Sequence, residues 1–146
     1  MKSHIKFREI HPDDFDQIKK LHEELFPVRY SDSFYTDACQ KRGINGGQLF
    51  TSIAVDSDNI IIGFIFAQFI DTKECEHSDI FRRNSKATEL CYILTLGLKT
   101  THRRSKLGSK LVTHCVDYAK GNLACGALYL HVIHYNVAVS IISVAL

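Results

Sequence analysis

The spacing of apolar residues along this chain predicts strands and helices in alternation. Residues 4–10 alternate apolar and polar side chains, which predicts a first strand. From residue 15 to residue 26 the apolar side chains recur every three or four positions, which predicts an amphipathic helix that ends at Pro27. Ser31 is suited to cap a second helix over residues 32–40.

A β-hairpin is predicted in the middle of the chain. Residues 49–55 and 60–70 have the composition of strands and flank a turn at residues 56–59. The second segment is almost continuously apolar, which indicates a strand covered on both faces. Residues 71–88 are polar without periodicity, which fits either a functional surface loop or an unconstrained insertion. A further strand is predicted at residues 127–133.

Residues 89–112 carry the clearest chemical signal. An apolar strand pattern at residues 91–98 leads into a basic loop and then into a helix with apolar residues on one face. No acidic residue occurs from residue 90 to residue 116, and five basic residues gather there: Lys99, Arg103, Arg104, Lys106 and Lys110. A helix N-terminus favours anions, so this loop predicts a site for phosphate or pyrophosphate. A solvated basic helix face is the simpler alternative, whereas a nucleotide P-loop is excluded because GxxxxGK[ST] is absent.

Two motifs adjoin in this stretch, the strand sequence YILTLGL at residues 92–98 and the loop sequence RRSKLGS at residues 103–109. Together they resemble the acetyl-CoA-binding core of the GCN5-related N-acetyltransferase (GNAT) family. The loop of that family reads Arg/Gln-x-x-Gly-x-Gly/Ala. Arg103 and Gly108 match it, and Lys106 stands at the first glycine. A lysine there either supplies charge to the pyrophosphate or narrows the loop and weakens cofactor binding.

Two further stretches, FPVRYSDSFY at residues 26–35 and LYLHV at residues 128–132, resemble the amino-terminal acetyltransferases of this family. The resemblance implies the GNAT fold, an α+β or α/β arrangement with a mixed central sheet between helices. It implies that acetyl-CoA is the co-substrate, with Tyr92 and His131 as catalytic residues. Acetyl-CoA would contact Leu96, Gly97, Leu98, Arg103, Arg104, Lys106, Gly108, Ser109 and Asn136. The substrate's first residue would lie against Phe26, Pro27, Val28 and Tyr30.

The implied reaction moves an acetyl group to the α-amino group of a protein N-terminus, with Met-starting N-termini favoured and histone lysines left open. An α-amino group titrates at about 7.7–8.0, so one positioned base or an ordered water completes its deprotonation. His131 suits that role by its intrinsic pKa, although a core histidine bonded to the backbone is the structural alternative. Tyr92, with an intrinsic pKa of about 10, would orient a water or the amine. A weakly active or inactive domain that binds acetyl-CoA is the alternative function.

Composition limits the remaining classes. The chain has 146 residues, 45% of them hydrophobic, which predicts a single domain over residues 1–146. The net charge of +2 and the lack of aromatic residues between Lys99 and Lys110 argue against a nucleic-acid partner. Five cysteines without CxxC spacing favour a reducing compartment, and no paired ligand spacing is present, so we expect no metal.

Residues 136–146 are apolar and uncharged, and they depart from the family pattern of an Asn-x-x-Phe-Tyr helix followed by two strands. We therefore expect a C-terminally incomplete domain in which this helix and these strands are altered or missing. The resemblance extends to a Golgi-associated member whose membrane anchor lies beyond this point. It implies the cytosolic face of the Golgi membrane for a longer chain and the cytosol for a shortened one. The sequence itself, without a signal peptide or an 18-residue apolar span, predicts a soluble intracellular protein.

Overall fold

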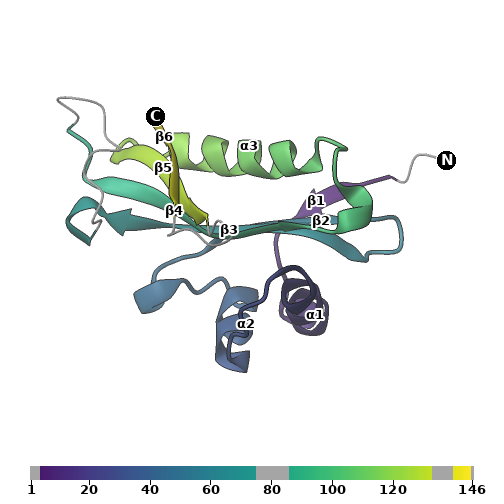
Figure 1. Ribbon diagram of the computed structural model, residues 1–146. Helices are drawn as coiled ribbons and strands as arrows, with labels where there is room; N and C mark the ends of the chain where they lie inside the picture. Colours follow the sequence, from purple (N-terminus) through teal and green to yellow (C-terminus); the bar gives the residue numbers. More distant parts are fainter. Residues whose placement is uncertain (1–3, 75–85, 133–139, 146) are drawn as a thin grey trace.

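Six strands form one sheet in the order β1-β2-β3-β4-β5-β6, with α1 and α2 on one face and α3 on the other (Figure 1). The computed structural model describes residues 4–74, 86–132 and 140–145. The strands are β1 (Lys6–Arg8), β2 (Phe50–Val55), β3 (Ile61–Asp71), β4 (Glu89–Leu98), β5 (Cys125–Val132) and β6 (Ser140–Ala145). The helices are α1 (Phe15–Leu25), α2 (Asp32–Cys39) and α3 (Leu107–Lys120). The predicted helices, hairpin and mixed sheet are confirmed.

Only one of the five strand pairs is parallel. β4 and β5 run in the same direction, and the other four pairs are antiparallel. A parallel pair needs a crossover connection, and α3 supplies it on one face of the sheet. This connection places the N-terminus of α3 beside the C-terminal end of β4.

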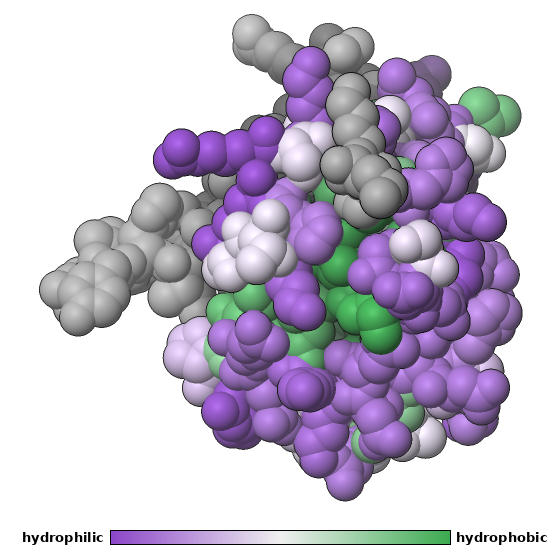
Figure 2. All heavy atoms as spheres, turned by 90° about the vertical axis from the view of Figure 1, so that its right-hand side faces the viewer, coloured by the Kyte–Doolittle hydropathy of each residue, from purple (hydrophilic) through white to green (hydrophobic). Residues whose placement is uncertain are grey.

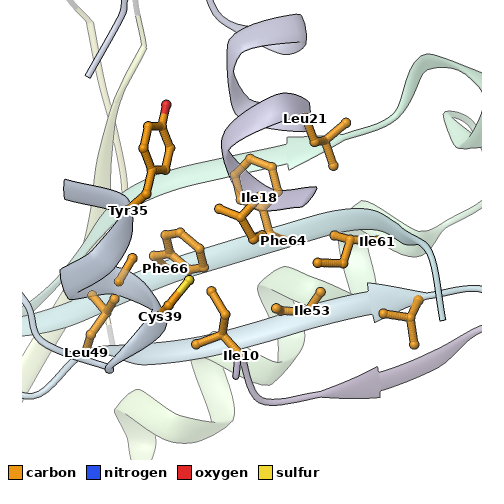
Figure 3. Close-up of a cluster of buried hydrophobic side chains, with 12 residues drawn as sticks. Ile10, Ile18, Leu21, Tyr35, Cys39, Leu49, Ile53, Ile61, Phe64 and Phe66 are labelled. Carbon is orange, nitrogen blue, oxygen red and sulfur yellow. The ribbon is translucent and has the colours of Figure 1, made fainter. Parts of the chain in front are cut away.

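Each face of the sheet is covered by its own hydrophobic cluster. Below the sheet, Ile18 and Leu21 of α1 and Tyr35 of α2 pack against Phe64 and Phe66 of β3, and all five are buried (Figure 3). This arrangement follows from the three- and four-residue spacing on α1, which puts its apolar side chains on one face. β3 is buried from residue 61 to residue 68, which confirms that it is covered on both faces.

Above the sheet, the helix α3 buries Leu111, Cys115 and Ala119 against Cys91 and Ile93 of β4. Both thiols are buried and serve as packing groups in this cluster. Residues 75–85, most of the predicted surface excursion, lie outside the described residues.

A partly buried ion pair joins β1 to the start of α1. The guanidinium of Arg8 donates two hydrogen bonds to the Asp14 carboxylate, at 2.8 and 2.9 Å, and the His11 backbone N–H donates a third at 2.7 Å. Burial alone would raise the pKa of Asp14, but these donors hold it below its usual range. The charged carboxylate therefore anchors the N-terminal end of α1.

Of the family helix and two strands that were expected to be altered or missing after residue 136, at least one strand is present. β6 pairs antiparallel with β5 from Ala127↔Ala145 to Val132↔Ser140. Residues 139–144 are rich in β-branched residues, which favour an extended backbone, and β5 offers them an otherwise free edge. β5 is therefore an interior strand, paired on both sides. No helix in the described part of the chain is both long enough and apolar enough to cross a membrane.

Candidate active site

β4 and β5 lie side by side over only part of their length. Their parallel pairing joins Glu89 to Cys125 and ends where Tyr92 meets Tyr129; no pair between the described residues of the two strands lies beyond it. β4 nevertheless stays paired with β3 as far as Leu98, and β5 stays paired with β6 as far as Val132. The two strands thus form a fork, bounded by residues 93–98 of β4 and residues 130–132 of β5. No described residue of β5 pairs with the backbone N–H and C=O groups on this edge of β4, and such groups can pair with a ligand.

A β-bulge at Leu94 accompanies the divergence. Thr95 pairs with Phe66 and Ile93 pairs with Ala67, so Leu94 is an extra residue in β4. A bulge bends its strand and increases the local twist, and bulges often lie beside active sites. Here it also puts two consecutive residues on the side of α1 and α2, because Leu94 packs in that cluster and Thr95 contacts α1.

Tyr92 and Tyr129 lie together at the base of the fork. Their ring centroids are 4.9 Å apart with an interplanar angle of 33°. Burial, with a smaller contribution from the neighbouring Tyr30, raises the pKa of Tyr92. The phenol therefore stays protonated at neutral pH, which suits a hydrogen-bond donor and not a base.

Of the other residues predicted to serve catalysis and cofactor binding, His131 belongs to β5, two residues beyond Tyr129, and its backbone pairs with Ile141 of β6. Its role as a base stays a prediction. Asn136 lies outside the described residues.

The basic loop lies at the open end of the fork, before α3. The side chains of Arg103, Arg104, Lys106 and Ser109 are exposed. The Arg103 Nε donates to the Leu98 carbonyl at 3.4 Å, which ties the loop to the end of β4. No acceptor among the described residues meets the backbone N–H groups of residues 107–109. Figure 2 faces this end of the molecule, and hydrophilic side chains cover most of it around a narrow hydrophobic strip.

Two glycine-related features shape the turn into α3. Lys106 has φ 67° and ψ 6°, so it adopts the left-handed conformation that glycine would take most easily. The lysine thus keeps a glycine-like turn at a cost of about 1 kcal/mol. A Cβ added at Gly108 would meet no atom within 4 Å, which leaves open space beside the first turn of the helix. Exposed cations, free N–H groups and this space fit a pyrophosphate.

Gly97 has a packing role in addition to its predicted place beside the cofactor. A Cβ there would lie 2.7 Å from the Phe64 Cζ and 2.9 Å from the Leu25 Cδ1. The absence of a side chain at Gly97 therefore lets α1 approach the sheet. Leu96 and Leu98, its predicted neighbours in the cofactor site, pack on the side of α3 instead.

The residues predicted to receive the substrate form the connection between α1 and α2. Val28 and Tyr30 are each 44% exposed, and Pro27 is exposed. Phe26 is half-buried and packs toward Phe64 at a centroid distance of 6.4 Å. Arg29 turns back, donating to the carbonyls of Glu23 at 3.0 Å and Phe26 at 3.3 Å. Its charge thereby complements the C-terminal end of α1 and leaves the apolar side chains exposed.

His22 is a residue that the sequence reasoning missed. It is 2% exposed on the apolar face of α1, hydrogen-bonded through Nδ1 to the Tyr35 hydroxyl at 3.1 Å and through Nε2 to Thr95 Oγ1 at 3.3 Å. Burial lowers its pKa to about 4, against a small opposing effect of the Glu23 carboxylate. Its place in the apolar stripe, beside Leu21 and Leu25, is the signal that could have identified it.

Metal ligation has no support in the described part of the chain. No three His, Cys, Asp or Glu side chains of residues 4–74, 86–132 and 140–145 are grouped to hold a metal ion.

Known sequences match most of this chain. The model of the "Acetyltransferase (GNAT) family" matches residues 15–139. Histone acetyltransferase MCC1 of Arabidopsis thaliana is 34% identical over 141 residues, covering 90% of this chain and 55% of that protein. N-alpha-acetyltransferase 60 of Xenopus tropicalis is 34% identical over 131 residues, covering 85% of this chain and 51% of that protein. The chain therefore spans about half the length of these curated relatives.

Solved structures agree with this similarity. Arabidopsis thaliana NAA60 in complex with a bisubstrate analogue superposes with a TM-score of 0.77 at 34% identity, over 91% of this chain and 76% of that one. The same protein in complex with acetyl-CoA gives a TM-score of 0.74 over 89% of this chain and 76% of that one. Arabidopsis thaliana Naa50 in complex with the bisubstrate analogue CoA-Ac-MVNAL gives 0.62 at 30% identity, over 88% of this chain and 72% of that one.

The lowered pKa of His22 predicts that acid destabilises the fold. The unfolded chain binds a proton at this residue below about pH 6.5, whereas the folded chain does so only below about pH 4. The contribution of His22 to the free energy of unfolding is therefore fully present above about pH 6.5 and is lost as the pH falls toward about 4. The free energy of unfolding measured in urea should be lower at about pH 4.5 than at about pH 7, and this group should account for on the order of 2 kcal/mol of the difference. The variant His22→Asn has no titratable group at this position, so its free energy of unfolding should depend less steeply on pH by that amount. An unchanged slope in the variant would contradict the buried neutral imidazole.

Proposed function

The chain belongs to the GNAT acetyltransferase family, and we propose that it transfers the acetyl group of acetyl-CoA to the α-amino group of protein N-termini. The observation that carries the proposal is the fork between β4 and β5, whose open end meets the N-terminus of α3. Relatives with solved structures support it, since one was crystallised with acetyl-CoA and another with CoA joined to a peptide that begins with Met.

The fork and the basic loop bind different parts of acetyl-CoA. Residues 96–98 of β4 present backbone groups to the fork, and these pair with the pantetheine amides as an added strand would. The N–H groups of residues 107–109 and the side chains of Arg103, Arg104 and Lys106 bind the pyrophosphate. The bound co-substrate supplies an activated thioester at the base of the fork, near Tyr92.

The chemistry needs a neutral amine beside that thioester. His131 accepts the proton of the α-ammonium group, and the Tyr92 hydroxyl, which remains protonated, orients the amine or a bridging water by donating a hydrogen bond. The amine nitrogen then bonds to the carbonyl carbon, and the carbon–sulfur bond breaks. The nitrogen gives up its second proton to become the amide, and the departing CoA thiolate takes up that proton. An α-amino group is easier to neutralise than a lysine side chain by about two to three pKa units, which favours N-termini as substrates.

The α1–α2 connection receives the first residue of the substrate. Phe26, Val28 and Tyr30 offer apolar surface, and Tyr30 is close enough to Tyr92 to affect its pKa. An apolar wall of this kind suits a methionine side chain, and the Naa50 analogue sequence MVNAL has that first residue. The proposal includes histone lysines as further substrates, which the name of the relative MCC1 supports. It also includes a location at the cytosolic face of the Golgi membrane, which comes from the sequence resemblance.

One observation favours the alternative of a weakly active domain that binds acetyl-CoA. Lys106 holds a left-handed conformation at the position of a family glycine, so the cofactor loop carries both an added side chain and backbone strain. Lys106 nevertheless adopts the left-handed turn that glycine would take most easily, which favours the active enzyme.

A peptide assay tests the proposed function. The chain, incubated with acetyl-CoA and a short peptide beginning Met-Lys, should yield peptide with a single acetyl group on the α-amino nitrogen, located by mass spectrometry. His131→Ala should reduce the rate roughly a hundredfold or more, as expected for loss of a general base, with urea unfolding little changed. Folded protein that binds acetyl-CoA without forming product would instead establish the weakly active domain.

Two substitutions separate the possible roles of Lys106. Lys106→Ala removes the charge and keeps the Cβ, while Lys106→Gly removes both. If the charge holds the pyrophosphate, both variants should bind acetyl-CoA about threefold more weakly at low salt, with less difference at high salt. Lys106→Gly should also be more stable than Lys106→Ala by about 1 kcal/mol, because glycine adopts positive φ without strain. Tighter binding by the glycine variant alone would mean that the Cβ narrows the loop.

A further inference from the structure

His22 is the point at which three elements of the site meet. It extends from α1, and its ring nitrogens hydrogen-bond to Tyr35 of α2 at 3.1 Å and to Thr95 of β4 at 3.3 Å. Thr95 directly follows the bulged Leu94 and lies three residues beyond Tyr92 in the same strand. A single buried ring therefore connects both helices below the sheet to the bent part of β4.

The same ring also supports the wall that faces the substrate. Its centroid is 4.7 Å from that of Phe26 and 5.2 Å from that of Tyr30, the residues on either side of the exposed segment 27–29. Tyr30 stacks in turn on Phe34 of α2 at 4.5 Å. The place of these two aromatic residues thus depends on where His22 is held.

An apolar side chain would fill this space but could not make both polar contacts. Neutral imidazole has one N–H donor and one nitrogen acceptor, so a single ring pairs with two hydroxyl groups at once, in either tautomer. Burial keeps the ring neutral at physiological pH, so this pairing persists there. No buried side-chain nitrogen or oxygen in the described part of the chain lacks a hydrogen-bond partner, and replacing the ring by a hydrocarbon would remove one partner from each hydroxyl.

We infer that His22 is a positioning residue for substrate selection: by bridging Tyr35 and Thr95 it fixes Phe26 and Tyr30 relative to β4, and so sets the pocket for the side chain of the first substrate residue. This inference rests on the proposed function. His22 itself touches no reacting atom, and the basic loop that binds the pyrophosphate lies on another part of the chain. Loss of the bridge should therefore weaken the peptide end of the site and leave the CoA end unchanged.

Binding measurements test this without requiring turnover. The probes are CoA alone and CoA joined through an acetyl group to the α-amino nitrogen of a peptide beginning Met-Lys, with a second analogue beginning Ala-Lys. The informative variants are Thr95→Val and Tyr35→Phe, which remove one hydroxyl each with little change of shape. Thr95→Ser restores the hydroxyl. Ile53→Val, in the same hydrophobic cluster but on β2, is the control for general loss of stability.

Both hydroxyl-removing variants should bind the Met analogue roughly tenfold more weakly and bind CoA within about twofold of the unaltered chain. The preference for the Met analogue over the Ala analogue should shrink in both. Thr95→Ser should retain affinity and preference, and Ile53→Val should lower stability without changing the ratio of analogue to CoA binding.

Three results would overturn the inference: equal losses for analogue and CoA, an unchanged Met preference in both variants, or no gain in affinity of the analogue over CoA in the unaltered chain. Failure of the proposed function would give a different result. The chain would bind the Met analogue more tightly than CoA and lose this gain in the variants, but it would transfer no acetyl group.

Discussion

The end of the parallel pairing between β4 and β5 at Tyr92 is the constraint on which the site depends. Backbone N–H and C=O groups need hydrogen-bond partners, and beyond Tyr92 no described residue of β5 supplies them to one edge of β4. A ligand with amide groups in a chain, as in pantetheine, meets that need in the manner of an added strand. The bulge at Leu94 bends β4 at the place where this edge begins.

Connectivity then brings an anion site to the same end of the sheet. Because α3 is the crossover between the parallel strands, it begins where β4 ends, and its first N–H groups point out of the helix at the mouth of the fork. The cations of the preceding loop would be unfavourable beside the positive end of a helix unless an anion neutralised them. In the proposed function, the fork and the loop are therefore complementary parts of one site, which hold the two chemically different halves of one co-substrate.

On the opposite face, the packing of α1 determines which side chains of the proposed substrate site are exposed. Gly97 lets Leu25 and Phe64 come close to β4. The hydrogen bond between His22 and Thr95 fixes the distance of α1 from β4. Arg29 donates hydrogen bonds to backbone carbonyls at the C-terminal end of α1, so apolar side chains and not these carbonyls are exposed at the connection to α2. The packing of these few residues below the sheet thus decides which side chains of the α1–α2 connection, the proposed substrate site, are exposed.

The sequence predicted the helices, the hairpin and the basic loop because each has a local signal: periodicity in α1, a turn at residues 56–59, and charge before α3. Three features had no local signal. The bulge at Leu94 and the pairing of β6 depend on register with another strand, and the contacts of His22 join residues up to 73 positions apart. Lys106 was recognised as a departure from the family loop, but its left-handed conformation appears only in the folded turn.

Amide hydrogen exchange with and without acetyl-CoA tests the central claim most directly. If the fork binds the pantetheine and α3 binds the pyrophosphate, acetyl-CoA should slow exchange in two separate segments, residues 96–98 of β4 and residues 107–109 of α3. The amides of β2, which already pair in the sheet, should change little. Protection of the α3 segment alone, or binding without protection of β4, would contradict the assignment of the fork as the acetyl-CoA site.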